Sequence, residues 1–326
     1  MKPLKERILT GAAADLAAIE KALADNLNPY LELCRTVAHH ILFAGGKRMR
    51  PLLMVLAARA CGSGGPEAVR LSTVFEYLHA ASLLHDDVVD DSALRRGKPA
   101  AHTVHGAAVT VLVGDFLLAR TCSIATETGV LPIIQTITDI TGIMSEGEIM
   151  QLVGKGDVKR TEADYLDTIE RKTAVLLAAA CKVGGLFAGA DGAGVQNLWN
   201  FGINLGIAFQ MADDLLDYTG DTKSTGKPVG TDLREGKLTL PLIYALEKAE
   251  TSERDEIIRI IGQGGFSDDE FGLVLSAVKR HGGLDYTLLS ARKHAEKAKE
   301  LLSDFPDNDG TRLLSLLADY SVERKS

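Results

Sequence analysis

The sequence predicts an all-α fold, and two observations carry that prediction. Apolar residues recur at helical spacing: segment 71–84 places Leu71, Val74 and Leu78 on one helical face, and segment 197–218 repeats the pattern. Runs that alternate apolar and polar residues, which are typical of strands, are nearly absent, and aromatic residues make up only 5% of the chain. Several candidate helices are apolar around most of their circumference, so we expect them at the centre of the fold.

Glycine-rich and polar segments separate the predicted helices. They lie at 61–66, 154–157, 262–267 and 281–285. We find no internal repeat, low-complexity segment or interdomain linker. The sequence therefore predicts a single all-helical domain over residues 1–326.

The segment 220–237 departs from the helical pattern. It is polar and rich in Gly, Thr and Lys, and it exceeds the length of about 12–15 residues beyond which loops are usually lids or disordered. Its lysines and glycines suit a flap that closes over phosphate. A surface loop without a ligand is the alternative.

The composition excludes several classes of protein. A net charge of −8 argues against a general nucleic-acid binder, which would carry a basic domain or stripe. The four cysteines are far apart and form no C-x-x-C pair, which indicates a reducing compartment and no structural zinc site. Neither a secretory signal nor a membrane-spanning segment is recognisable, so we expect a cytoplasmic protein.

Two acidic clusters share the spacing D-D-x-x-D. They are HDDVVDD, with Asp86, Asp87, Asp90 and Asp91, and MADDLLDY, with Asp213, Asp214 and Asp217. Asp86 and Asp90 lie one helical turn apart, where like charges destabilise a helix unless a cation neutralises them. Mg²⁺ fits, because it takes one or two carboxylates and bridges to substrate phosphates. One such cluster alone is more often a solvated helical face; two, each within apolar helices, predict a metal site.

Two basic clusters accompany the acidic ones, and the second of them follows the first acidic cluster directly. AGGKRMRP at 44–51 contains Lys47, Arg48 and Arg50, and SALRRG at 92–97 contains Arg95 and Arg96. Arginine matches phosphate with two parallel hydrogen bonds, and lysine acts as a compact point charge. A basic patch alone is more often a solubility feature. Beside the acidic clusters, the patches predict two diphosphate sites, one held through metal and one held directly by Arg and Lys.

These segments resemble the trans-isoprenyl diphosphate synthase family, and within it the long-chain polyprenyl diphosphate synthases of bacteria. The motifs that carry the resemblance follow the family's order and span most of the chain. They are GGKRMRP (45–51), HDDVVDDSALRRG (85–97), GD (114–115), KT (172–173), FQMADDLLD (209–217) and the GK pairs at 226–227 and 236–237. The resemblance implies an antiparallel helical bundle around a deep central cavity, of the class I isoprenoid synthase type. It also implies a homodimer, with the two acidic motifs facing each other at the mouth of the cavity.

The resemblance further implies a reaction and a role for individual residues. An allylic diphosphate such as farnesyl or geranylgeranyl diphosphate ionises, and isopentenyl diphosphate adds to it, with more than one Mg²⁺ per site. The implied metal ligands are Asp86, Asp87, Asp90, Asp213, Asp214 and Asp217, of which Asp86, Asp90 and Asp213 are the principal ones. The residues implied to bind isopentenyl diphosphate are Lys47, Arg50, His79 and Arg96. Those implied to hold the allylic diphosphate and stabilise its developing charge are Arg95, Lys172, Thr173, Gln210, Lys227 and Lys237.

Two small residues bear on the length of the product. Ala81 and Ser82 lie one turn before Asp86, where they would point along the path of the growing chain. In the family that the sequence resembles, short-chain synthases place bulky residues there. We therefore expect a long product, best matched by octaprenyl diphosphate within a range from hexaprenyl to decaprenyl, and a shorter-chain geranylgeranyl or hexaprenyl synthase is the alternative. The floor of the cavity is expected deeper, in the helix that contains Phe116, Leu117 and Arg120. The resemblance points to quinone side chains as the product's use.

Four alternatives remain open from the sequence. A class I terpene cyclase also ionises prenyl diphosphates, but it usually lacks the second D-D-x-x-D motif. A head-to-head synthase needs no basic isopentenyl site. A non-catalytic subunit of a heteromeric synthase typically loses one acidic motif, and a helical scaffold does not explain two matched acidic clusters.

Overall fold

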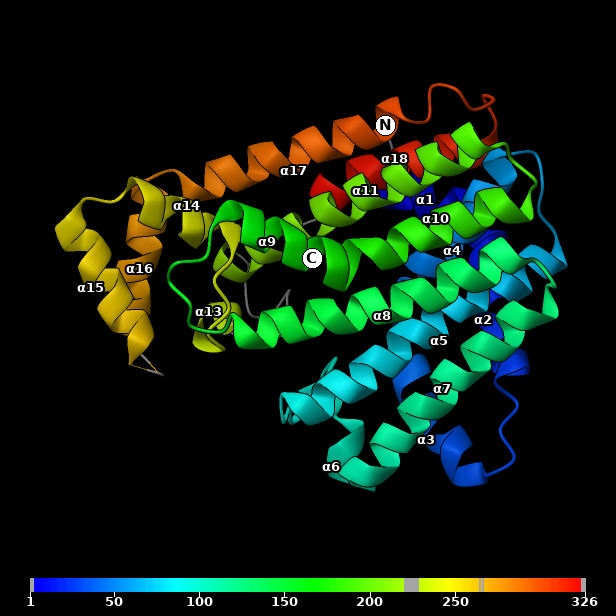
Figure 1. The fold of residues 1–326 in the computed structure, drawn as a ribbon, viewed down its shortest axis with the longest axis horizontal. Helices are drawn as coiled ribbons and strands as arrows, with labels where there is room; N and C mark the ends of the chain where they lie inside the picture. Colours follow the sequence, from blue (N-terminus) through cyan, green and yellow to red (C-terminus); the bar gives the residue numbers. More distant parts are fainter. Residues whose placement is uncertain (1–2, 220–228, 264, 266, 324–326) are drawn as a thin grey trace. The chain divides into compact units, whose positions relative to one another are not determined.

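The computed structural model describes residues 3–219, 229–263, 265 and 267–323 (Figure 1). The described part is helical apart from one short hairpin, which confirms the prediction of an all-α fold. Its elements, in chain order, are α1 (Leu4–Gly11), α2 (Ala13–Leu27), α3 (Glu32–Leu42), α4 (Met49–Ala60), α5 (Pro66–Val89), β1 (Leu94–Arg95), β2 (Lys98–Pro99), α6 (Ala101–His105), α7 (Ala107–Glu127), α8 (Leu131–Val153), α9 (Glu162–Ile169), the π-helical turn η1 (Glu170–Ala174), α10 (Val175–Phe187), α11 (Gly192–Thr219), α13 (Thr231–Arg234), α14 (Leu240–Lys248), α15 (Thr251–Gly262), α16 (Asp268–Arg280), α17 (Gly283–Glu300) and α18 (Asp309–Glu323).

The helices and their breaks lie where the sequence predicts them. Segment 71–84 lies within α5, and segment 197–218 lies within α11. Each of the four predicted breaks falls at or next to the end of a helix. The segment 220–237 contains the short helix α13 in its described part. Predictions that concern residues 220–228 lie outside the described residues.

The hairpin of β1 and β2 is the one sheet in the described residues, and the sequence did not predict it. The strands pair antiparallel, Leu94 with Pro99 and Arg95 with Lys98. Arg96 and Gly97 form the two-residue turn with φ angles of 54° and 75°. Positive φ at both central residues is typical of a hairpin turn whose twist matches its strands.

Contacts divide the chain into two compact units, each built from three segments. Unit 1 comprises Met1–Thr141, Leu176–Trp199 and Leu302–Leu316, and unit 2 comprises Gly142–Val175, Asn200–Leu301 and Leu317–Ser326. The single domain therefore stays a prediction.

Helix α5 is the centre of unit 1. It packs against α2, α4 and, most extensively, α7, which lies beside it in Figure 1. Thirteen of its residues are buried, among them Phe75, Tyr77 and Ala81. Its apolar circumference explains this position, because no face of the helix can be left to water without exposing large side chains. The acidic cluster lies at the C-terminal end of this buried helix.

Helix α7 is the one described helix that is long and apolar enough to cross a membrane. Only about a third of its most apolar window is buried in the structure. A core helix of a soluble protein passes the same test of length and composition, and α7 packs along α5.

Unit 2 has its own apolar core. Buried side chains from α9, α11, α14, α15 and α16 form one cluster, which includes Ile169, Met211, Tyr218 and Ile260. Around this core, η1, α11 and α13 place polar side chains on one pocket.

Candidate active site

The acidic end of α5 presents two carboxylates one turn apart. The N–H of Asp90 donates to the carbonyl of Asp86 at 2.8 Å, which closes the last turn of the helix. Both residues are partly exposed. The C-terminal end of a helix carries partial negative charge from its last carbonyl groups. A cation is therefore favoured at this position by the helix as well as by the two side chains.

Asp87 points into the protein. It is buried, and its Oδ1 accepts hydrogen bonds from Nε of Arg95, at 2.8 Å, and from Nη2 of the same guanidinium. A buried carboxylate needs such a partner because desolvation penalises its charge. The pair ties the hairpin to the end of α5. In this structure the two side chains bind each other. The resemblance implies different partners for them: a metal ion for Asp87 and the allylic diphosphate for Arg95.

The basic segment before α4 is held by a buried arginine. Arg48 has a left-handed backbone with φ 48°, which is costly for a residue with a Cβ. Its guanidinium donates to Glu20 at 2.7 and 3.0 Å and to the buried Glu76 at 2.8 Å. These charged hydrogen bonds offset the strain. They fix Arg48 between Lys47, which is exposed, and Arg50, which is partly exposed.

His79 lies two turns before Asp86 on α5 and is surrounded by positive charge. Burial lowers the pKa of His79 well below its ordinary value of 6.5. Four guanidinium groups lower it further: Arg50, Arg96, Arg95 and Arg48. The imidazole is therefore neutral near pH 7. A cluster of four arginines favours an anion in this part of unit 1.

In unit 2, Lys172 and Thr173 belong to the π-helical turn η1. The N–H of Val175 donates to the carbonyl of Glu170, five residues earlier. Nζ of Lys172 lies 2.5 Å from Oε2 of Glu148 and 2.5 Å from Oε1 of Gln151. A π-helical turn inside a helix is rare and often marks a functional position.

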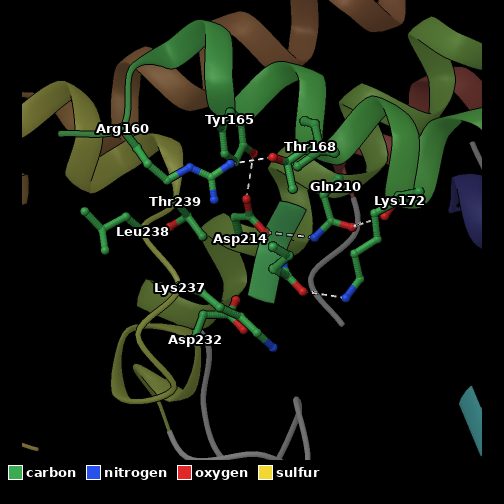
Figure 2. Close-up of a pocket in the computed structure, with 13 residues that line it drawn as sticks. Arg160, Tyr165, Thr168, Lys172, Gln210, Asp214, Asp232, Lys237, Leu238 and Thr239 are labelled. Carbon is green, nitrogen blue, oxygen red and sulfur yellow. Dashed lines mark hydrogen bonds between the residues drawn. The ribbon is translucent and has the colours of Figure 1, made fainter. Parts of the chain in front are cut away.

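The hydroxyl of Thr173 begins a chain of hydrogen bonds. It donates to Oε1 of Gln210 at 3.0 Å, and Nε2 of Gln210 donates to Oδ1 of Asp214 at 2.9 Å. The hydroxyl of Tyr165 donates to the second oxygen of Asp214 at 2.6 Å. Figure 2 shows Asp214 of this row with its hydrogen bonds to Tyr165 and Gln210.

The pocket has a volume of about 140 Å³. Four of the residues implied to hold the allylic diphosphate line it together, namely Lys172, Thr173, Gln210 and Lys237. Arg160 and Asp232 line it too, and the sequence reasoning missed both. Three cationic side chains thus converge on a small polar pocket, which suits a diphosphate. Arg95 belongs to unit 1, and Lys227 lies outside the described residues.

Asp214 is an unusual carboxylate within this pocket. It is 2% exposed, and burial, with the negative charge of Asp232 beside it, raises its pKa to about 8. Burial, followed by the charge of Asp214, raises the pKa of Tyr165 well above its ordinary value. A metal ligand must be ionised, so neighbouring positive charge is needed before Asp214 can act as one.

Asp213 and Asp217 differ in their surroundings. Asp213 is partly exposed on α11. Oδ1 of Asp217 accepts the backbone N–H of Thr231, and Oδ2 accepts that of Asp232, each at 3.1 Å. These are N–H groups at the start of α13, which have no partner inside the helix. Asp217 therefore fixes α13, which precedes Lys237.

Comparisons with known proteins identify the family. The sequence model of the polyprenyl synthetase family matches residues 31–278. The chain belongs to this family. It is 39% identical to the octaprenyl diphosphate synthase of Escherichia coli (strain K12) over 319 residues, which is 98% of each chain.

Solved structures of polyprenyl synthases share the fold. A polyprenyl synthase from Caulobacter crescentus CB15, solved with calcium and isoprenyl diphosphate, is 41% identical, with a TM-score of 0.92 over 98% of each chain. A decaprenyl diphosphate synthase from Rhodobacter capsulatus is 39% identical, with a TM-score of 0.92 over 99% of this chain and all of the other. This chain is thus a long-chain trans-prenyl diphosphate synthase, a transferase that joins isopentenyl diphosphate to an allylic diphosphate.

The donors in this polyprenyl synthetase fit a divalent metal, on which the family depends. Asp86, Asp90 and Asp213 are partly exposed oxygen donors, and oxygen is the ligand that magnesium and calcium prefer. Oδ2 of Asp87 is buried without a hydrogen bond to the described residues, which leaves negative charge for a nearby cation. No three acidic, histidine or cysteine side chains among the described residues form a closed metal cage. That arrangement suits an ion that completes its shell with water and substrate phosphate.

The two chain-length residues lie on α5. Ala81 is fully buried, and Ser82 is partly exposed, with its hydroxyl donating to the carbonyl of His79 at 2.9 Å. Their role stays a prediction, as do the roles of the other site residues.

Proposed function

We propose that this synthase elongates farnesyl or geranylgeranyl diphosphate to octaprenyl diphosphate with Mg²⁺ as its metal. The observation that carries the proposal is the shared pocket of Lys172, Thr173, Gln210 and Lys237. These side chains come from three separate segments of the sequence and meet at a site whose charge and size suit a diphosphate.

The protein's own groups divide the work of the reaction. Lys172, Lys237 and Arg160 hold the allylic diphosphate and stabilise charge as it develops on the leaving pyrophosphate. Asp86 and Asp90 in unit 1, and Asp213 in unit 2, are the residues that would hold Mg²⁺, and the metal would neutralise charge on the leaving pyrophosphate. The arginine cluster around His79 holds isopentenyl diphosphate close to the reacting carbon, so a bimolecular step becomes effectively unimolecular.

Ala81 and Ser82 support a long product. Both side chains are small and lie one turn before Asp86 on α5, so they take up little of the space that a growing chain would need. The similarity to an octaprenyl synthase from Escherichia coli agrees with this length. The chain is also similar to a decaprenyl diphosphate synthase from Rhodobacter capsulatus, so a product longer than octaprenyl is the alternative.

We further propose that the synthase acts as a homodimer in the cytoplasm. Ala108, Leu112, Ala119 and Cys122 are exposed and alternate four and three residues apart along α7, with Asp115 between them. This spacing suits packing against the same helix of a second copy. All four cysteines are free thiols, as a reducing compartment requires.

Incubation with farnesyl diphosphate, labelled isopentenyl diphosphate and MgCl₂ tests the function. We expect elongation that stops with EDTA, and a longest main product of eight isoprene units by mass. Products of four units or fewer would refute the octaprenyl assignment, and elongation that persists with EDTA would refute the role of Mg²⁺.

A further inference from the structure

We propose that Gly147 of α8 and Gly206 of α11 are positioning residues for the π-helical turn η1. They let two helices approach the backbone of this turn, and so fix where Lys172 and Thr173 lie in the pocket. The proposal rests on the proposed function for the identity of the ligand and on the structure for the geometry.

The turn η1 needs support from outside itself. A π-helical turn inserts an extra residue into a helix and makes i→i+5 hydrogen bonds, and it is uncommon because its packing is poor. Here it interrupts two regular stretches, α9 and α10. Contacts from neighbouring elements must therefore hold the turn in its conformation, as they do for other strained backbone at functional sites.

Gly147 provides contact from one side. A Cβ added to this glycine would lie 2.5 Å from the backbone nitrogen of Lys172 and 2.9 Å from the carbonyl carbon of Arg171. Non-bonded heavy atoms prefer about 3.5–4.0 Å. The groups in the way belong to the backbone, so a rotamer change cannot relieve the overlap. Any larger residue at 147 must displace η1 by roughly 1 Å.

Gly206 provides contact from α11. A Cβ added there would lie 2.4 Å from Cα and 2.6 Å from Cβ of Ala174, the last residue of η1. Ala174 is fully buried, so the turn has no free space to retreat into. Four residues further along α11, Gln210 receives the hydrogen bond of Thr173. The close approach at Gly206 therefore sets the distance on which that hydrogen bond depends.

Ion pairs flank the contact at Gly147. Arg171 donates to Glu146 at 3.0 Å, and Lys172 pairs with Glu148 at 2.5 Å. Two acidic residues of α8 thus meet two successive basic residues of η1, with the glycine between them. The pairing fixes the rotation of the turn, while the glycine fixes its distance from α8.

Displacement of η1 should affect one substrate more than the other. A shift of about 1 Å in a positioned group can reduce a rate by roughly 100-fold. Lys172 and Thr173 belong to the allylic pocket in unit 2, whereas the arginine cluster belongs to unit 1. We therefore expect the KM for the allylic substrate to rise without a matching rise for isopentenyl diphosphate.

Gly147→Ala and Gly206→Ala test the proposal, with Gly142→Ala as the matched control. Gly142 lies on α8 as well, but nothing is within 4 Å of a Cβ added there. Initial rates are measured with MgCl₂ while each substrate is varied in turn, and thermal melting is followed in parallel. We expect both test variants to raise the KM for farnesyl diphosphate about 10–100-fold and that for isopentenyl diphosphate less than about 3-fold. Gly142→Ala should match the wild type or melt slightly higher.

A wild-type KM for farnesyl diphosphate in a folded Gly147→Ala variant would overturn the proposal, as would equal changes for both substrates. If both glycine variants fail to fold, Arg171→Ala decides. Arg171 is partly exposed and lies outside the core. Its loss should raise the KM for farnesyl diphosphate several-fold, and no change would overturn the proposal.

Failure of the proposed function can be distinguished from failure of the positioning role of the two glycines. If the wild type does not elongate farnesyl diphosphate, calorimetry with inorganic pyrophosphate and MgCl₂ still applies. Weaker binding by Gly147→Ala than by Gly142→Ala supports the positioning role, and equal binding overturns it.

Discussion

Neighbouring aspartates in the two acidic motifs have different partners. Successive residues of a helix point about 100° apart, so adjacent carboxylates cannot share one environment. Asp86 and Asp213 are partly exposed, whereas Asp87 is bound by Arg95 and Asp214 is buried in the pocket. Removal of one carboxylate should therefore differ in its effect from removal of its neighbour.

Replacement of Ala81 by Phe should shorten the product. Ala81 is fully buried on α5, five residues before Asp86, so a phenyl ring there would fill space on the predicted path of the chain. The extra volume should also cost about 1–3 kcal/mol of stability. Mass analysis of the products provides the measurement. Leu289→Phe, on the exposed side of α17, is the control, and an unchanged product length in Ala81→Phe would remove this position from the length control.

The neutral state of His79 should make stability depend on pH. Above its ordinary pKa of 6.5, His79 is neutral in both the folded and the unfolded chain. Below that value the unfolded chain binds a proton that the folded chain does not, so stability falls as the pH falls. The limit is about 1.4 kcal/mol per pH unit. Urea unfolding between pH 5 and 7 should show a smaller slope for His79→Gln, and an unchanged slope for the exposed His39→Gln. Equal slopes in His79→Gln and the wild type would contradict the prediction.

Among the elements, the π-helical turn η1 could not be predicted from the pattern of apolar residues in the sequence. Apolar periodicity located α5 and α11 because both helices bury many apolar side chains at helical spacing. The turn η1 has no such pattern: its extra residue is stabilised by contact with Gly147 and Gly206, which are remote in sequence. Tyr165, Arg160 and Asp232 were missed for the same reason, since only the fold brings them to Gln210.

Asp217 should contribute to stability in the absence of metal, and Asp213 should not. Loss of the carboxylate in Asp217→Ala leaves two N–H groups of α13 without their acceptor, which should cost about 1–2 kcal/mol. Asp213→Ala removes a partly exposed charge that repels the buried Asp214, so the change in stability should be less than about 0.5 kcal/mol. Both variants should lose turnover. Unfolding in EDTA measures the difference, and equal stability of the two variants would argue against the role of Asp217 at α13.

At the scale of the whole molecule, chemistry is divided between two units. The arginine cluster and the first acidic motif belong to unit 1, and the allylic pocket and the second acidic motif belong to unit 2. The sequence predicted the fold class, and four of its six candidate residues for the allylic diphosphate line one pocket, because motifs are local. It did not predict the pairs Asp87–Arg95 and Lys172–Glu148, which arise only when the chain folds.

Disruption of the exposed face of α7 should separate the proposed dimer. Leu112 is 66% exposed, and a charge there would be buried unpaired if two copies of α7 meet. The chain has a mass of 34.9 kDa. Light scattering should give twice this mass for the wild type and the single mass for Leu112→Glu. A wild-type monomer, or an intact dimer of Leu112→Glu, would exclude this face as the interface.

The chain of hydrogen bonds from Thr173 through Gln210 to Asp214 runs in one direction. Each hydrogen points toward Asp214, from Tyr165 on one side and from Thr173 through Gln210 on the other. The single hydroxyl hydrogen of Thr173 is thus turned inward, so an incoming phosphate oxygen meets only lone pairs. Recruitment of this hydroxyl by a phosphate oxygen requires it to rotate away from Gln210, which releases the amide oxygen of Gln210 from that hydrogen bond. Ligand entry therefore exchanges one hydrogen bond for another, so Thr173 contributes direction rather than net attraction.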